Sequence, residues 1–445
     1  VYKRQIYKQL PDLVGLIMKV AILTIGCKLN QYESEYLIES LEKSGFVVVD
    51  FKDIADIYVI NTCTVTSQAD SKSRQAIRQA RRRNPDSIVV ATGCYAEINR
   101  DELKKIGADI VVGNVEKVFL SDIIKRYVME GISECASNLT PDKFYPMPID
   151  DFKDYSRAFV KIQDGCDFRC SYCIVWKARG KSRSADPRFV LDEVKRLVDK
   201  GFEEIVLTGV HLGSYGKDIG LTLVDLLEEL VKVESLKKIR LSSIEPTEWT
   251  DELIDFISHD KIAKHFHIPL QSGSDRILGL MNRNYSRKFF EDLILRINKS
   301  VPIAGIGVDV IVGFPTEDEE DFKATYTLLR DLPIYYMHIF TYSDRPATVA
   351  SSMTPKVLPS VKRKRWETLK ELKDIKMDGF VSSFIGRNLE GVIEGRVTED
   401  GLFTRGLSEN YIPLLIPGDH RNLKGKVCNF RVVEKRYLNL VAELI

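Results

Sequence analysis

The sequence lacks both a long apolar run and a marked excess of charge of either sign. No stretch approaches the 18 or more consecutive apolar residues of a membrane-spanning helix, so we expect no membrane partner. The 65 basic and 64 acidic residues leave a formal net charge of +1, which excludes a global field that would attract a polyanion. Any nucleic-acid partner must therefore be held by local basic patches.

A secretory signal is also lacking. Residues 1–17 contain neither a continuous apolar core nor a cleavage site of small residues, and Met18 directly after them is a natural start. We therefore expect the native protein to begin at Met18 and to be cytoplasmic. Eight cysteines in a reducing compartment favour free thiols, which serve as ligands or as small buried side chains, over disulfides.

The chain contains three segments with different hydrophobic patterns. Residues 18–130 alternate short apolar runs such as KVAILTI with helical patterns, which predicts a parallel α/β sheet. Residues 152–384 contain six such units and predict a partial (βα)6 barrel, because a full eight-unit barrel takes about 250 residues. Residues 386–445 contain short strands between Gly, Asp and Asn turns and predict a small antiparallel β-barrel. We therefore expect an α/β protein of three domains.

A tight group of cysteines follows the first strand of the second segment, where βα barrels build their active sites. Three residues separate Cys166 from Cys170, and two separate Cys170 from Cys173. Three thiolates on one loop can bind three irons of a 4Fe–4S cluster and leave the fourth iron open. The amino and carboxylate groups of S-adenosylmethionine can occupy that iron.

Two alternatives concern this loop. A zinc site would need a fourth Cys or His close by, and none lies between Cys173 and His211, so zinc is the weaker interpretation. Tyr172, between the last two cysteines, is either a core aromatic or a residue that packs on the adenine of a bound cofactor.

A second group of cysteines is dispersed along the first segment. Cys27, Cys63 and Cys94 each end an apolar run, in VAILTIGC, YVINTC and IVVATGC. Because the carboxyl ends of parallel strands share one edge of a sheet, these thiols can converge on a second cluster. The alternative is three unrelated buried thiols, the role that we assign to Cys135 and Cys428.

In this order, the motifs resemble the methylthiotransferases, a radical S-adenosylmethionine family with an N-terminal cluster domain, a radical barrel and a C-terminal TRAM domain. The resemblance covers about residues 18–445 and includes Ala178-Arg179-Gly180 besides the two cysteine groups. The segments TIGCKLNQYESE and NTCTVTSQADSKSRQAIR are similar to the MtaB-type branch, which acts on N6-threonylcarbamoyladenosine in tRNA.

This resemblance implies insertion of a methylthio group at C2 of that nucleotide, which lies 3′ of the anticodon. One S-adenosylmethionine would methylate sulfur carried at the cluster of Cys27, Cys63 and Cys94. Another would be cleaved to a 5′-deoxyadenosyl radical at the 4Fe–4S cluster of Cys166, Cys170 and Cys173. The implied partners are the tRNA anticodon arm, a flavodoxin- or ferredoxin-like electron donor and a sulfur donor. No general acid or base is assigned.

The resemblance also implies cofactor contacts at the ends of the barrel strands. They are the backbone of Thr208 and Gly209, the side chains of Ser243 and Glu245 near the ribose, and Gln271 in the cofactor wall. A hydroxyl and a carboxylate suit a ribose diol, although Glu245 taken alone would more often be a salt-bridged surface residue. We interpret the nearby His267 as a core residue and not as a catalyst.

Basic residues near both cysteine groups and in the last segment are candidate contacts to RNA phosphates, although such runs are often merely solvated faces. These candidates are Lys72, Arg74, Arg78, Arg179, Arg183 and Arg405.

Two rival functions remain. The same chemistry could act on isopentenyladenosine in tRNA or on a ribosomal protein, although the branch motifs argue against both. A protein of another class, a zinc-stabilised and non-catalytic tRNA-binding protein, would contain zinc and no iron.

Overall fold

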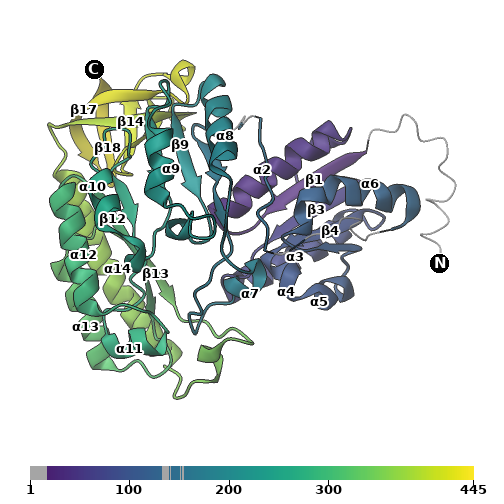
Figure 1. The fold of residues 1–445 in the computed structure, drawn as a ribbon, viewed down its shortest axis with the longest axis horizontal. Coiled ribbons are helices and arrows are strands. Elements are labelled where there is room, and N and C mark those ends of the chain that lie inside the picture. Colours follow the sequence, from purple (N-terminus) through teal and green to yellow (C-terminus); the bar gives the residue numbers. More distant parts are fainter. Residues whose placement is uncertain (1–17, 133–139, 141, 151, 153–154) are drawn as a thin grey trace. The chain divides into compact units, whose positions relative to one another are not determined.

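The computed structural model of the protein describes residues 18–132, 140, 142–150, 152 and 155–445. The chain divides into two compact units, each built of helices and strands (Figure 1). Among the described residues, the first unit contains 18–150, 164–168 and 173–183, and the second contains the rest. The second unit includes both the central and the C-terminal strands, so the division into three domains remains a prediction from the sequence.

The first unit is built on a five-stranded sheet with the order β2-β1-β3-β4-β5. Every neighbouring pair is parallel, which confirms the predicted parallel sheet. The strands are β1 (Lys19–Thr24), β2 (Val47–Val49), β3 (Ile57–Thr62), β4 (Ile88–Gly93) and β5 (Ile110–Val112). Because all five run in the same direction, their carboxyl ends meet at one edge of the sheet.

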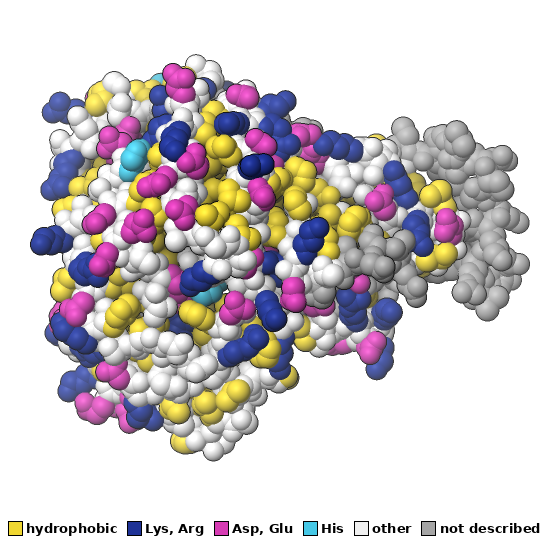
Figure 2. Space-filling model, viewed as in Figure 1, with side chains coloured by type: hydrophobic (Ala, Val, Ile, Leu, Met, Phe, Trp, Pro, Cys, Tyr) yellow, Lys and Arg dark blue, Asp and Glu magenta, His cyan; other side chains and the backbone are white. Residues whose placement is uncertain are grey.

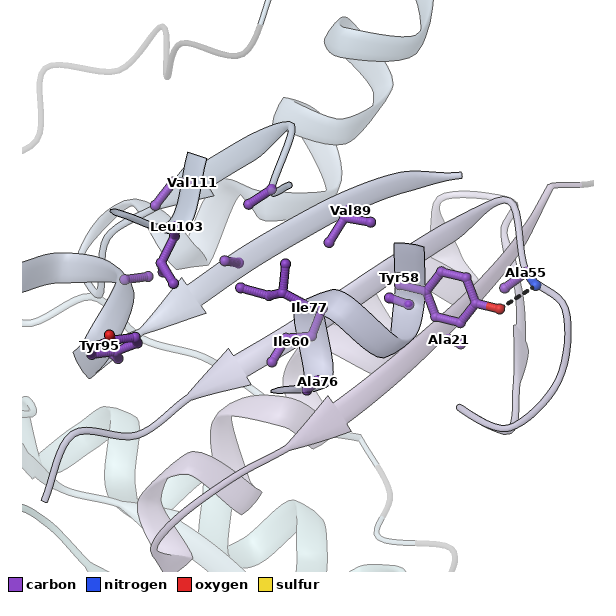
Figure 3. Close-up of a cluster of buried hydrophobic side chains, with 14 residues drawn as sticks. Ala21, Ala55, Tyr58, Ile60, Ala76, Ile77, Val89, Tyr95, Leu103 and Val111 are labelled. Atoms are coloured by element: carbon purple, nitrogen blue, oxygen red, sulfur yellow. Dashed lines mark hydrogen bonds between the residues drawn. The ribbon is translucent and has the colours of Figure 1, made fainter. Parts of the chain in front are cut away.

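Helices cover both faces of this sheet, so its central strands are continuous apolar runs. Leu37 and Ile123 pack on one face together with Val59. Ile77, Tyr95 and Leu103 pack on the opposite face in the cluster that Figure 3 shows. The first face is covered by α2 (Lys28–Lys43) and α6 (Leu120–Glu130), and the second by α3 (Ser67–Arg83), α4 (Cys94–Ile98) and α5 (Arg100–Lys105).

The second unit contains six parallel strands in two sheets, with the orders β10-β9-β6 and β11-β12-β13. A parallel bridge between Ile239 and Ile262 connects the ends of the two sheets. This arrangement confirms the predicted partial (βα)6 barrel. The strands are β6 (Ala158–Lys161), β9 (Glu204–Thr208), β10 (Lys238–Leu241), β11 (His265–His267), β12 (Gly305–Val312) and β13 (Tyr336–Thr341).

Helices follow these strands and pack on the outer face of the partial barrel. Val308 and Val310 of β12 point to this face and are fully buried, whereas Gly307 and Asp309 alternate with them and point to the inner face. No helix among the described residues is both long enough and apolar enough to cross a membrane. The helices are α8 (Pro187–Asp199), α9 (Leu223–Leu230), α10 (Asp251–Phe256), α11 (Asp275–Leu280), α12 (Arg287–Ser300), α13 (Glu319–Asp331) and α14 (Pro359–Ser382).

The C-terminal strands form the predicted small barrel, closed in the order β14-β15-β16-β18-β17. The barrel is not wholly antiparallel as predicted, because β16 and β18 pair in parallel to close it. Phe430 and Val432 fill its core. The strands are β14 (Asn388–Val397), β15 (Phe403–Ser408), β16 (Pro413–Pro417), β17 (Val427–Arg436) and β18 (Asn439–Leu444).

Buried polar contacts join this small barrel to the central strands of the same unit. The Arg240 guanidinium donates to the carbonyl oxygens of Glu409 at 3.0 Å and Ser408 at 3.2 Å. The rings of His265 and Tyr411 stack with centroids 4.3 Å apart. The guanidinium satisfies carbonyl groups at the end of β15 that would otherwise be buried without a partner.

We expect Phe430→Ala to lower the free energy of unfolding of the small barrel by about 3–5 kcal/mol, because it leaves a cavity in place of a buried ring. Native-state hydrogen exchange of the barrel amides measures this loss. Phe430 is 0% exposed, whereas Phe289 on α12 is 43% exposed and provides the control Phe289→Ala. Equal effects of the two substitutions would contradict the packing described above.

Candidate iron–sulfur and cofactor sites

The three dispersed cysteines all lie at the carboxyl edge of the first unit's sheet. Cys27 is the N-cap residue of α2, shortly after β1. Cys63 directly follows β3, and Cys94 is the first residue of α4, directly after β4. Since β1, β3 and β4 are neighbours, the three thiols come from adjacent strand ends, as the sequence predicts.

Close packing brings these thiols together. Gly26 has a φ of +114°, and a Cβ atom built on it would lie 2.7 Å from the Cys63 sulfur, so only glycine fits there. Burial raises the pKa of the Cys63 thiol to about 11, and the charges of Cys94 and Cys27 contribute to this rise. A metal that binds these sulfurs must therefore displace protons.

This arrangement fits a cluster bound by three thiolates. Cys63 and Cys94 are buried, whereas Cys27 is exposed, so the edge is accessible from one side. Three thiolates satisfy three irons of a 4Fe–4S cluster and leave the fourth open. Cys27, Cys63 and Cys94 are the residues that would hold it.

The buried guanidinium of Arg179, at the end of α7 (Val175–Arg179), contacts one of these sulfurs. Its Nε donates to the Cys94 sulfur at 3.1 Å, and its Nη2 donates to Asn30 Oδ1 at 2.9 Å. Both of its Nη groups also donate to the Glu33 carboxylate. The charges of Cys94, Glu33 and Asp164 outweigh burial and hold the pKa of Arg179 well above its ordinary value.

The same network ties the three strand ends to one another. Asn30 Nδ2 donates to the carbonyl oxygens of Ile25 at 2.7 Å and Thr62 at 3.0 Å, just before Cys27 and Cys63. The ammonium group of Lys117 also binds the Glu33 carboxylate and donates to Asn61 Oδ1 at 3.1 Å. Sequence analysis missed Lys117, because a lone lysine in an apolar context carries no signal of its own.

Arg179 and Arg183, two of the candidate contacts to RNA phosphates, are buried in the structure. The two residues are 3% and 4% exposed, and Arg183 forms an ion pair of 3.0 Å with Asp164. Two buried carboxylates, Glu33 and Asp164, thus face three buried cations. Because the buried cations outnumber the buried carboxylates, their charge suits an adjacent anionic cluster and not an RNA phosphate at the surface.

The tight cysteine loop contributes Cys166 and Cys173 to the first unit. The Cys166 amide donates to the Gly180 carbonyl oxygen at 3.0 Å, and the Val175 amide donates to the Cys173 sulfur at 3.4 Å. Gly165 has a φ of +77°, and a Cβ atom there would lie 1.8 Å from the Lys181 carbonyl oxygen. The turn before Cys166 therefore requires glycine.

The same loop contributes Cys170 to the second unit, where a second guanidinium contacts sulfur. Arg283 Nη1 donates to the Cys170 sulfur at 3.3 Å, and the guanidinium forms an ion pair with the Glu245 carboxylate. Glu245 is therefore already paired, so a ribose hydroxyl would share this carboxylate with Arg283. Sequence analysis missed Arg283, although it lies in the polar segment MNRNY between two helices.

The other predicted cofactor residues lie at the carboxyl ends of barrel strands. Thr208 ends β9, and Gly209 follows it, where a Cβ atom would lie 2.8 Å from Gln163 Oε1. Ser243 is exposed after β10. Gln271 has a φ of 64° and bridges to Val310 of β12. These positions fit a cofactor across the barrel mouth, and their contacts with it remain predictions.

Tyr172 is partly buried. It packs against a buried apolar cluster that includes Phe314 and Tyr342. Its predicted contact with adenine therefore remains a prediction. Cys428 lies on β17, partly buried against the core of the small barrel, and Cys135 lies outside the described residues.

The remaining predicted RNA contacts differ in accessibility. Lys72 and Arg78 are exposed on α3, and Arg405 is exposed on β15. Arg74 is partly buried and donates to the Tyr95 hydroxyl at 2.6 Å. Basic and acidic side chains are intermixed on the face shown in Figure 2, in agreement with the balanced composition. RNA contact by these four residues remains a prediction.

Two known families match the chain. The Uncharacterized protein family UPF0004 matches residues 19–113, which include Cys27, Cys63 and Cys94. The Radical SAM superfamily matches residues 160–329, which include the tight cysteine loop and strands β6 to β12.

Several curated proteins are similar over nearly the whole chain. The "Threonylcarbamoyladenosine tRNA methylthiotransferase MtaB" of Aquifex aeolicus is 46% identical over 89% of this chain and 96% of its own. The Bacillus subtilis protein of the same name is 39% identical over 94% of both chains. A "tRNA-2-methylthio-N(6)-dimethylallyladenosine synthase" of Clostridium botulinum is 32% identical over 97% of this chain and 98% of its own.

A solved structure shows the same fold at lower identity. The radical S-adenosylmethionine methyltransferase TsrM from Kitasatospora setae matches with a TM-score of 0.57 and 17% identity. The match covers 76% of this chain and 77% of that chain. It supports the arrangement of the strands and helices described above.

We expect Arg179→Gln to destabilise the first unit by about 3–5 kcal/mol, because Glu33 and Asp164 then lose a cationic partner in a buried ionic network. It should also lower the iron and sulfide bound by Cys27, Cys63 and Cys94. Both contents are measured in a chain whose tight-loop cysteines are replaced by Ala, so that the remaining iron reports these thiols alone. Urea unfolding measures the stability.

Lys177→Gln is the matched control, because Lys177 is exposed on the same helix. It should leave both measurements unchanged, and Arg179→Lys should retain part of the iron because it keeps the charge. Full iron content and unchanged unfolding in Arg179→Gln would contradict the role of this network.

Proposed function

Because the chain belongs to the methylthiotransferase family of radical S-adenosylmethionine enzymes, we propose that it adds a methylthio group to C2 of N6-threonylcarbamoyladenosine in tRNA. The nucleotide would be the one 3′ of the anticodon. The observation that carries the proposal is the pair of three-cysteine sites, one at the sheet edge and one on the loop after β6. The two relatives with the highest identity given above support the choice of substrate.

The two cysteine sets would have different roles. Cys166, Cys170 and Cys173 would hold the cluster that supplies reductive cleavage of S-adenosylmethionine to a 5′-deoxyadenosyl radical. Cys27, Cys63 and Cys94 would hold the cluster that carries the sulfur to be methylated and transferred. A radical route suits the target, because an aryl C–H bond offers no acidic proton for acid–base catalysis.

Other residues of the chain would support these ligands. Arg283 donates to the Cys170 sulfur and Arg179 to the Cys94 sulfur, so each cluster would have a fixed cation beside it. Such hydrogen bonds orient a ligand and change the redox potential of the cluster. Both guanidinium groups are in turn held by buried or partly buried carboxylates.

The proposal includes partners that the chemistry requires. A low-potential electron must come from an external donor of the flavodoxin or ferredoxin class, and the transferred sulfur must come from a sulfur donor. The anticodon arm of tRNA is the proposed macromolecular partner, with Lys72, Arg74, Arg78 and Arg405 as candidate phosphate contacts. Since tRNA is the substrate, we place the reaction in the cytoplasm.

The test is anaerobic purification with iron and sulfide analysis, followed by incubation with reductant, S-adenosylmethionine and tRNA that carries N6-threonylcarbamoyladenosine. Two clusters per chain and a methylthio mass gain in the digested nucleosides are expected. tRNA that carries isopentenyladenosine is the parallel substrate. A gain on that tRNA alone would contradict the substrate, and zinc without iron would contradict the enzyme class.

Cysteine substitutions should separate the two sites. We expect Cys166→Ala to abolish both 5′-deoxyadenosine and the methylthio product, because the radical is no longer made. Cys27→Ala should retain 5′-deoxyadenosine formation and lose the product. Chromatography of 5′-deoxyadenosine and mass spectrometry of the nucleosides measure the two outcomes.

Cys428→Ala is the matched control, because this thiol lies on β17 of the C-terminal barrel and belongs to neither set. It should leave both products unchanged. If Cys27→Ala forms normal amounts of product, or Cys166→Ala still forms 5′-deoxyadenosine, the assignment of roles is wrong.

A further inference from the structure

Two histidines and an aspartate meet on the inner face of the second unit's strands. His267 ends β11, Asp309 lies within β12, and His338 lies within β13. Asp309 and His338 are direct partners across the parallel pair β12 and β13, and His267 pairs with Gly307, two residues before Asp309. The sheet register therefore places one donor from each strand on the same face.

The three donor atoms form a compact set. The distances from Asp309 Oδ1 are 3.0 Å to His267 Nε2 and 3.1 Å to His338 Nδ1. All three ligand atoms lie within 4.8 Å of one another. A tetrahedral ion bonded at about 2.1 Å to each of three atoms would separate them by about 3.4 Å, which is close to both distances from Asp309.

The surroundings make room for one ligand ring and orient the other. Gly307 lies between the two histidine strands, and a Cβ atom there would lie 3.1 Å from His267 Nδ1, closer than a side chain normally packs. The second ring nitrogen of His338, Nε2, lies 2.9 Å from the Tyr336 hydroxyl. Such a partner on the other ring nitrogen is what orients histidine ligands in metal sites.

The chemistry of the three donors also suits a cation. Asp309 offers a carboxylate oxygen, and His267 and His338 each offer a ring nitrogen. Two imidazoles and one carboxylate are a donor set that binds Zn²⁺ or Fe²⁺.

Exposure distinguishes this set from a closed structural site. The side chain of His267 is 9% exposed, that of Asp309 25% and that of His338 44%. Catalytic metal sites combine three protein ligands with an open position, whereas structural zinc sites are closed by four. The partly exposed side provides that open position.

We propose that His267, Asp309 and His338 bind one first-row divalent metal ion of the Zn²⁺ class, with an open coordination position for an oxygen ligand. The site uses none of the six cluster cysteines, and the proposal stands whether or not the proposed substrate is correct. It revises the interpretation of His267 as a core residue with no further role.

The test uses holoenzyme with both clusters reconstituted anaerobically, to which Zn²⁺ alone is added before loosely bound metal is removed by gel filtration. Elemental analysis should find one zinc per chain, with iron and sulfide unchanged. Zinc K-edge absorption should show nitrogen and oxygen ligands at about 2.0–2.1 Å and no sulfur at about 2.3 Å. A sulfur shell would place the zinc on the cysteines and overturn the proposal.

Substitutions locate the ion. Asp309→Asn and His338→Gln should weaken zinc binding by at least about tenfold, and Tyr336→Phe should weaken it by roughly tenfold through the orientation of His338. His259→Gln is the matched control, because His259 is an exposed histidine of the same unit. Unchanged iron, sulfide and circular dichroism verify folding. Equal zinc content in the wild-type protein and Asp309→Asn would overturn the proposal.

Discussion

One buried carboxylate, that of Glu33, holds together the edge of the sheet on which the first unit's cysteines lie. It pairs with the guanidinium of Arg179 and the ammonium of Lys117. All three side chains are almost inaccessible to water. Burying such charges costs several kcal/mol per ion unless each one is paired and hydrogen-bonded. Asn30 completes the pairing and reaches the strand ends before Cys27 and Cys63, so thiols from distant parts of the chain share one rigid support.

The second unit repeats this principle with different residues. Arg283 lies between the Cys170 sulfur and the Glu245 carboxylate, as Arg179 lies between Cys94 and Glu33. In each unit a cation that contacts sulfur is held in place by a carboxylate behind it. A cation fixed in this way can neutralise part of the charge of an anionic cluster without the reorganisation that water would require.

Much of the fold could be predicted from local patterns. The apolar runs before Cys27, Cys63 and Cys94 predict strands, and parallel topology then brings the strand ends to one edge. The six βα units and the small C-terminal barrel could likewise be predicted from apolar runs and the turns between them. The parallel pairing of β16 with β18 could not be predicted, because the direction in which a barrel closes depends on contacts between strands distant in sequence. The burial of Arg179 and Arg183 could not be predicted either, since burial is a property of the packed chain.

The sequence by itself predicts the chemistry that we propose for this protein, because the spacing of cysteines after predicted strands indicates two three-thiol sites. It also determined the family, through motifs in a fixed order. Only the tertiary structure decided which charges are buried beside those sulfurs, since Glu33, Lys117 and Arg179 come from segments far apart in the chain. It likewise decided that His267, Asp309 and His338 meet on one face, because strand register sets which side chains become neighbours.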